Sequence, residues 1–191
     1  TRSKARMRLE GASHSAAVAR ATSYFSPTSS FNDCTGGIGY YFFLDQVCRD
    51  YEKPDNPKAL TKKLSQVCSR LFTRNHLLVS FTAEESGYER LACGMDKLSS
   101  CLEKSDGVVY PYQFQPKNRN EGFKTASQVN YVARCGSFAG SGKDYTGALR
   151  ILKVILNYDY LWINLRVQGG AYGCMSRFGR SKEAYLVSYR D

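Results

Sequence analysis

The most continuous run of hydrophobic positions lies between residues 144 and 173, and Gly169-Gly170 interrupts it near its end. Its length, its composition and the glycine stop predict a buried helix. On an α-helix the polar residues of this segment fall into one narrow stripe, made up of Arg150, Lys153, Asn157, Asn164 and Gln168. Asp159 and Arg166 project from the opposite, apolar side.

Arg166 needs a partner in such a helix, because an unpaired buried charge costs several kcal/mol. One interpretation is that its guanidinium bonds the last carbonyls of the helix and complements the helix dipole. The other is that it reaches into a cavity, with Tyr172 beside it on the turn that the glycines loosen. The helix pattern alone leaves both interpretations open.

The rest of the chain alternates between helical and strand patterns. Periodicity predicts helices over residues 1–25 (interrupted near Gly11 and Ser13), 37–52, 58–72 and 86–102, with a break at Pro27. Alternating and β-branched runs predict strands over residues 76–82, 122–126, 128–138, 174–178 and 184–189, of which 76–82 is buried and the last two form a hairpin. This order predicts an α+β fold, an antiparallel sheet with helices packed on one face.

The amino-acid composition and the hydrophobic periodicity change partway along the chain. The segment 106–119 is rich in Pro, Gly and polar residues, and it has few periodic apolar positions. We therefore expect two partial domains, 1–105 and 120–191, joined by a linker at 106–119.

Composition narrows the classes of function. Of the 191 residues 42% are hydrophobic, enough to bury a core. Because no uncharged apolar run reaches about 18 residues, we expect no transmembrane helix and no membrane partner. The net charge of +10 favours anionic partners. However, the basic residues are spread along the chain without a recognisable nucleic-acid module, so nucleic acid is not an expected partner.

The seven cysteines are odd in number and include no Cys-x-x-Cys pair, which predicts reduced and mostly buried thiols. We therefore expect a reducing compartment, the bacterial cytoplasm. The alternative is the mitochondrial matrix, because the first 26 residues are rich in Arg and Ser and mimic a targeting segment. We favour an ordinary surface helix for that segment.

Several kinds of chemistry are missing from the chain. The glycine-rich segment 136–144 lacks the spacing of a phosphate-binding loop and has Asp144 after Lys143, so we expect a strand-to-helix loop with Asp144 near the N-cap. His14 and His76 belong to no zinc-peptidase motif, and we expect an exposed helix residue and a strand-edge residue, respectively. Taken alone, the chain looks catalytically incomplete.

One motif resembles a known family. The sequence Arg166-Val-Gln-Gly-Gly-Ala-Tyr172-Gly on a long apolar helix, followed by a strand ending in Ser-Tyr-Arg-Asp, resembles the C-terminal half of the pitrilysin/insulinase family of zinc metallopeptidases. The similarity is to the presequence-protease (falcilysin-like) branch. NEGFKTASQVNYVARCGSF, residues 120–138, looks like the opening of the fourth homologous domain, and the upstream part looks like the close of the third.

The resemblance implies a peptidase of four related α+β domains, whose two halves enclose a chamber. Zinc and the general base belong to the first domain, so this chain alone would bind no metal. Arg166 and Tyr172 match the pair that the last domain contributes to substrate binding and catalysis. Gly169 and Gly170 would let the backbone approach the substrate and aim the tyrosine. The implied partners are peptide substrates and the N-terminal half of the same protein.

The expected function is therefore a fragment of a zinc-dependent oligopeptidase. A metal-activated water would attack a peptide carbonyl, Arg166 would orient the substrate backbone, and Tyr172 would stabilise the oxyanion. Alone, the chain would be inactive. The alternative is a non-catalytic scaffold or peptide-binding half of the same family.

Overall fold

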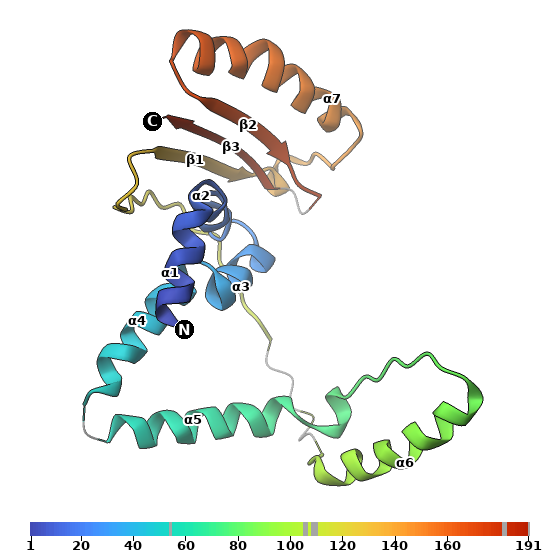
Figure 1. Cartoon of the computed structure of the whole chain (residues 1–191). Helices are drawn as coiled ribbons and strands as arrows, with labels where there is room; N and C mark the ends of the chain where they lie inside the picture. The colour runs from blue at the N-terminus through green and yellow to red at the C-terminus, as the bar shows by residue number, and fades with distance from the viewer. Residues whose placement is uncertain (54, 105–106, 108–110, 181–182, 191) are drawn as a thin grey trace. The chain divides into compact units, whose positions relative to one another are not determined.

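The computed structural model describes residues 1–53, 55–104, 107, 111–180 and 183–190. These form two compact units, residues 1–48 with 113–191 and residues 49–112 (Figure 1). Parts of the predicted linker (106 and 108–110) and of the predicted hairpin turn (181–182) lie outside the described residues. The compact units are defined by contacts within the structure, whereas the predicted domains are defined by homology. The two divisions need not coincide, so the domains 1–105 and 120–191 stay a prediction.

The chain begins with four helices: α1 (Arg2–Gly11), α2 (Ser13–Thr22), α3 (Pro27–Gly36) and α4 (Ile38–Tyr51), of which the last three residues of α4 belong to the second unit. The predicted helix over residues 1–25 and its interruption are confirmed, since Ala12 leaves the helical conformation between α1 and α2. Helix α4 confirms the prediction for 37–52. Helix α3 was not predicted. Its start is capped because the Ser26 hydroxyl accepts the Ser29 N–H at 3.3 Å, and Pro27 suits the first turn of a helix.

In the described residues, one antiparallel sheet has the strand order β1-β3-β2. Its strands are β1 (Asn130–Ser137), β2 (Gly173–Phe178) and β3 (Glu183–Arg190). They confirm the strands predicted over 128–138, 174–178 and 184–189, and also the hairpin of β2 and β3. The strand predicted over 122–126 is wrong, because that segment is irregular and exposed and no described strand pairs with it.

Helices cover both faces of this sheet (Figure 1). Helix α2 lies on β1, where the rings of His14 and Tyr131 are 6.2 Å apart. Helices α7 (Ala148–Ile155) and η3 (Leu156–Gln168) lie against β2. There the Asn157 side-chain oxygen accepts both the Ser176 N–H and the Ser176 hydroxyl at 2.8 Å.

The sheet register places these two contacts on opposite faces. Tyr131 pairs through Tyr189 with Gly173, and Ser176 is three positions further along β2, so its side chain points the other way. The α+β class is confirmed. The expectation that the helices pack on one face is corrected, because α2 occupies the second face. Among the described residues the buried apolar side chains are Val187 (1% exposed), on the face toward α2, and Leu161 (2%), on η3.

The long helix differs from its prediction. It begins at Ala148 with Gly147 at the N-cap, so Asp144 lies in the preceding strand-to-helix loop, which also contains η2 (Ala139–Ser141). From Leu156 onward it is a π-helix with i→i+5 hydrogen bonds.

A π-helix rotates by a smaller angle per residue than an α-helix. The polar residues predicted to form one stripe therefore point in different directions. Asn157 is half-buried against the sheet, whereas Asn164 and Gln168 are exposed. For the same reason Asp159 and Arg166, seven positions apart, no longer share a face. Leu161 is the one buried residue of η3, so the expected buried helix is mostly exposed. The sheet can cover one side of it, and no other described segment covers the rest.

The second unit contains α5 (Asn56–Leu71), η1 (Arg74–His76) and α6 (Glu85–Cys101). These confirm the helices predicted over 58–72 and 86–102. The buried strand predicted over 76–82 is wrong: His76 ends a 3₁₀ turn, and Leu78 is 91% exposed. An apolar run forms a strand only with a partner, and no described segment pairs with this one.

Two further expectations concern thiols and membranes. All seven cysteines are free. Cys135 and Cys174 are half-buried and the other five are exposed, so the expectation of mostly buried thiols is wrong. Among the helices that the described residues form, none is both apolar enough and long enough to span a membrane.

Arg20 connects three segments of the first unit. Its guanidinium donates to Asp33 on α3 at 2.6 Å, and to both carboxylate oxygens of Glu121, ahead of β1, at 2.7 and 3.1 Å. Asp33 in turn accepts the Gly39 N–H of α4 at 3.3 Å. The Arg20 and Asp33 side chains are only 18% and 5% exposed. Removing one partner of such a buried pair leaves the other charge uncompensated.

We therefore predict that Arg20→Ala lowers the free energy of unfolding by roughly 3 kcal/mol, as expected for breaking a buried ion pair. Urea denaturation followed by circular dichroism measures this. The control is Arg6→Ala, which removes an exposed pair with Glu10 and should leave the midpoint nearly unchanged. Equal effects of the two substitutions would contradict the structural role of Arg20.

The hydrogen bonds from Arg20 lower the pKa of Glu121 from 4.5 to about 2. A depressed carboxyl pKa stabilises the fold fully above the unfolded-state pKa, and the contribution is lost as the pH falls through the folded-state pKa. Unfolding midpoints measured between pH 5 and about pH 2 should therefore fall more steeply in the native chain than in Glu121→Gln. Parallel pH profiles would show that Glu121 is not coupled to folding.

Candidate functional site

Arg166 lies in the last turn of η3 and is exposed. Its guanidinium carbon lies 4.0 Å from the centre of the Trp162 ring, which is a cation–π contact. Within the described residues the guanidinium does not bond the last carbonyls of the helix, so that part of the first interpretation is wrong, whereas its position in the last turn does complement the helix dipole. The pKa of the Cys174 thiol is raised by burial and partly lowered again by the Arg166 charge, so this charge acts on the start of β2.

Tyr172 lies on the turn between η3 and β2, six positions after Arg166. Its backbone N–H donates to the Tyr189 carbonyl at 2.9 Å, and the two rings are 5.7 Å apart. The residue is 65% exposed. Its backbone is thus fixed to the sheet, while much of its side chain is accessible to a ligand.

The two glycines end the helix as the sequence predicts. Gly170 has φ +70°, and its N–H donates to the Arg166 carbonyl at 3.1 Å, the bond of a left-handed helix stop. A Cβ at Gly169 would lie 2.8 Å from the Leu165 carbonyl oxygen. Both positions therefore favour glycine. The turn that they form places Tyr172 next to the sheet.

Sequence reasoning missed Gly173 and Tyr189 as positioning residues. A Cβ at Gly173 would lie 2.6 Å from atoms of the Tyr189 ring, closer than real Cβ contacts allow. The ring therefore occupies the space that a side chain at 173 would need, and it also contacts Tyr172 and Tyr131. The sequence does contain a signal, because Gly173 directly follows Tyr172. However, that Tyr189 lies opposite Gly173 is evident only from the strand register.

The structure places Arg166 and Tyr172 at the two ends of one short turn, both exposed. Neither lines the cavity found in the first unit. No group of three His, Cys, Asp or Glu side chains in the described part of the chain could hold a metal ion. The described residues therefore do not fit a zinc site, and what this segment offers chemically is a guanidinium and a phenol.

Gly173→Ala should lower the free energy of unfolding by about 1–3 kcal/mol, because the new methyl group forces the Tyr189 ring out of place. The matched control is Gly136→Ala in β1, where a Cβ meets nothing within 4 Å. Differential scanning calorimetry compares the two variants. A Gly173→Ala variant that is no less stable than Gly136→Ala would refute the close approach.

Comparisons with known proteins agree with the motif. The family model of the PreP C-terminal domain matches residues 120–191. The protein HypA of Clostridium perfringens (strain 13 / Type A) is 36% identical over 190 residues, which are 97% of this chain and 19% of HypA. Presequence protease 1, chloroplastic/mitochondrial, of Arabidopsis thaliana is 27% identical over 195 residues, 100% of this chain and 18% of that protein.

A third relative is the mitochondrial presequence protease of Yarrowia lipolytica, 24% identical over 205 residues that cover 96% of this chain and 19% of that protein. The chain thus spans about a fifth of the curated relatives it matches. The relatives come from a bacterium and from eukaryotes, so both expected compartments stay open. Motif, α+β fold and comparisons agree: residues 120–191 match the PreP C-terminal domain, and over nearly its whole length the chain is similar to HypA and to presequence proteases.

Proposed function

We propose that this chain is part of a zinc-dependent oligopeptidase and supplies Arg166 and Tyr172 to its substrate site. The single observation that carries the proposal is the placement of a guanidinium and a phenol six positions apart, both exposed, at the glycine stop of η3. Zinc and its ligands would come from the N-terminal half of the same protein, because the described residues offer no metal-binding cluster.

The chemistry of the two groups suits peptide-bond hydrolysis. The tetrahedral intermediate of this reaction carries a negative oxygen, which is stabilised by hydrogen-bond donors fixed in advance. Tyr172 would donate its phenolic hydrogen to that oxygen, while Arg166 would donate to the substrate backbone. The cation–π contact with Trp162 would orient the Arg166 guanidinium, and the backbone bond and ring contact with Tyr189 would position Tyr172 before a substrate binds.

The glycines support this role. Gly169 and Gly170 have no side chains, so a peptide backbone could approach the turn closely. The rest of the oligopeptidase would close the site, because exclusion of water strengthens such hydrogen bonds. The substrates would be short peptides in extended conformation, since these can reach a turn inside a chamber.

A non-catalytic half of the same family is the second candidate. It is favoured by the exposure of both donors, which would also suit a peptide-binding surface. Metal analysis of the intact protein separates the two candidates. Stoichiometric zinc together with peptide hydrolysis supports the oligopeptidase, whereas an intact protein that is inactive and free of zinc supports the scaffold.

In the intact protein, Tyr172→Phe should lower kcat/KM for peptide hydrolysis by about a hundred- to a thousand-fold, the usual effect of removing one oxyanion donor. Arg166→Ala should also lower kcat/KM, by at least about tenfold, because a charge-assisted hydrogen bond to the substrate backbone is lost. The reason is that each substitution removes a donor without changing the fold. Steady-state hydrolysis of a quenched fluorescent peptide measures the change, with zinc content and melting temperature as checks on folding.

Two substitutions serve as matched controls. Tyr160→Phe removes an exposed phenol of η3, and Arg90→Ala removes an exposed guanidinium of α6. Both should leave kcat/KM within about twofold, because neither side chain lies on the turn. Near-normal hydrolysis by Tyr172→Phe and Arg166→Ala would rule out the proposed roles.

A further inference from the structure

A row of aromatic rings leads away from Tyr172 across one face of the sheet. The centres of the Tyr172 and Tyr189 rings are 5.7 Å apart, and those of the Tyr189 and Tyr131 rings are 5.8 Å apart. The His14 ring of α2 continues the row, 6.2 Å from the Tyr131 ring. All three distances fall in the range of about 4.5–7 Å over which aromatic rings attract one another. The row therefore connects the candidate site with α2.

Tyr189 is the ring of this row that contacts Tyr172. It lies on the central strand β3, opposite Gly173 of β2 on one side and opposite Tyr131 of β1 on the other. Its ring lies over Gly173, because a Cβ there would meet ring atoms at 2.6 Å. Side chains at directly opposite positions are close neighbours, so the Tyr131 ring takes up the space on the β1 side. Tyr189 can therefore lean toward β2 but not toward β1.

His14 supports Tyr131 from a helix that is itself fixed to the sheet. Tyr131 is half-buried and His14 is exposed. Helix α2 packs on β1 and β3 and covers Val187, which is only 1% exposed. At the other end of the helix, the Arg20 guanidinium donates to both carboxylate oxygens of Glu121, at 2.7 and 3.1 Å. These contacts determine where the His14 ring meets the row.

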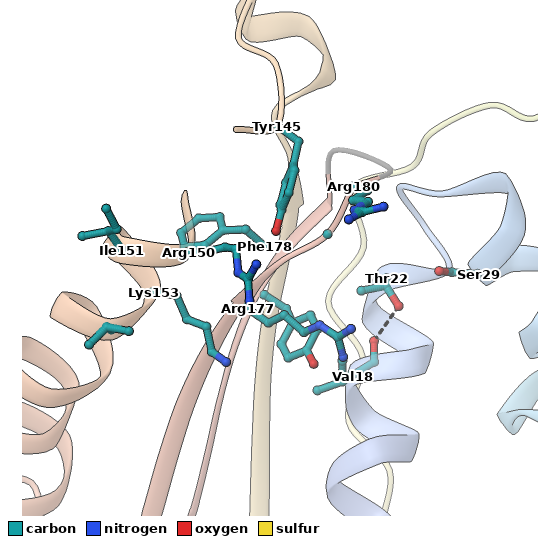
Figure 2. A pocket seen from close by; sticks show the side chains of 13 residues that line it. Val18, Thr22, Ser29, Tyr145, Arg150, Ile151, Lys153, Arg177, Phe178 and Arg180 are labelled. Carbon is teal, nitrogen blue, oxygen red and sulfur yellow. Dashed lines mark hydrogen bonds between the residues drawn. The ribbon is translucent and has the colours of Figure 1, made fainter. Parts of the chain in front are cut away.

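The row is separate from the cavity of about 1080 Å³ in the first unit. That cavity lies beside the second half of α2. Figure 2 shows Val18 and Thr22 there, and the Thr22 hydroxyl donates to the Val18 carbonyl at 2.9 Å. His14 lies at the start of the helix, and neither His14 nor any of the three tyrosines lines the cavity. The first turn of α2, and not the cavity, is thus the part that bears on the candidate site.

We propose that Tyr131 and His14 are positioning residues for Tyr172. The two rings keep the Tyr189 ring on its β2 side, and Tyr189 holds the Tyr172 phenol in the orientation that donates to an oxyanion. This inference rests on the proposed function of Tyr172. His14 lies upstream of residues 120–191, which match the PreP C-terminal domain. A helix from outside the matched segment therefore takes part in arranging the site.

The expected effect falls on the chemical step of peptide hydrolysis. Tyr172 acts on an oxyanion that develops only after attack, so misplacing it lowers kcat and leaves KM nearly unchanged. In the intact protein, Tyr131→Leu should lower kcat by about two- to tenfold, the factor that corresponds to losing one aromatic pair. Tyr131→Phe keeps the ring and should retain the native kcat. His14→Leu should have a smaller effect than Tyr131→Leu, because it removes only the last contact of the row.

A double substitution separates positioning from a general loss of stability. Tyr172→Phe already lacks the phenolic donor, so adding Tyr131→Leu to it should lower kcat no further. The matched control is Tyr185→Leu. Tyr185 is half-buried on the same face of β3, four residues or roughly 13 Å away from Tyr189. Tyr185→Leu should leave kcat unchanged even where it lowers the melting temperature.

Crystal structures of the intact variants give a readout that does not depend on hydrolysis. In Tyr131→Leu the Tyr189 ring should turn from Gly173 toward β1, or occupy both orientations, and the Tyr172 ring should move with it. In Tyr131→Phe both rings should keep their native positions. Unchanged rings in Tyr131→Leu would overturn the inference.

Three kinetic outcomes would also overturn it. These are a native kcat in Tyr131→Leu, an equal loss of kcat in Tyr131→Leu and Tyr131→Phe, and a full additional loss when Tyr131→Leu is added to Tyr172→Phe. Failure of the proposed function looks different. If the intact protein hydrolyses no peptide, or if Tyr172→Phe has the native kcat, the role of Tyr172 fails. The crystal structures then still decide whether Tyr131 holds the row of rings in place.

Discussion

The close approach of Gly173 to the Tyr189 ring is the contact on which the candidate site depends. Tyr189 fills the space above residue 173, accepts the backbone N–H of Tyr172 through its carbonyl and packs against the Tyr172 ring. The turn after η3 is therefore attached to the central strand of the sheet, and not only to its own helix. With the left-handed Gly170, this contact decides where Arg166 and Tyr172 are presented.

Much of the fold could be predicted, because local patterns determine it. The break between α1 and α2 and the β2–β3 hairpin both follow from residues close together in the sequence. The errors arose where partners are distant. Residues 76–82 have a strand composition but no strand beside them, and the α7–η3 helix is apolar on sides that the sheet cannot reach. Apolar composition indicates that a segment needs covering, not what covers it.

The candidate site shows the same division. Arg166 and Tyr172 came from one local motif, and the helix stop at Gly169-Gly170 from a known backbone rule. The stacking of Arg166 on Trp162 joins residues four positions apart, which are neighbours on an ordinary α-helix too, so the sequence pattern could have indicated it. The cavity of the first unit is lined by residues of α2, α7 and β2, and the contact of α2 with the sheet joins segments far apart in the sequence.

The central claim is that the turn after η3 presents donors to the carbonyl group of a bound peptide. A crystal structure of the intact protein with an uncleaved peptide analogue tests it most directly. The account predicts that the Tyr172 hydroxyl oxygen lies about 2.7–3.1 Å from the position of the oxyanion, with the Arg166 guanidinium on the peptide backbone. A bound peptide that touches neither group, with both side chains turned into bulk solvent, would contradict it.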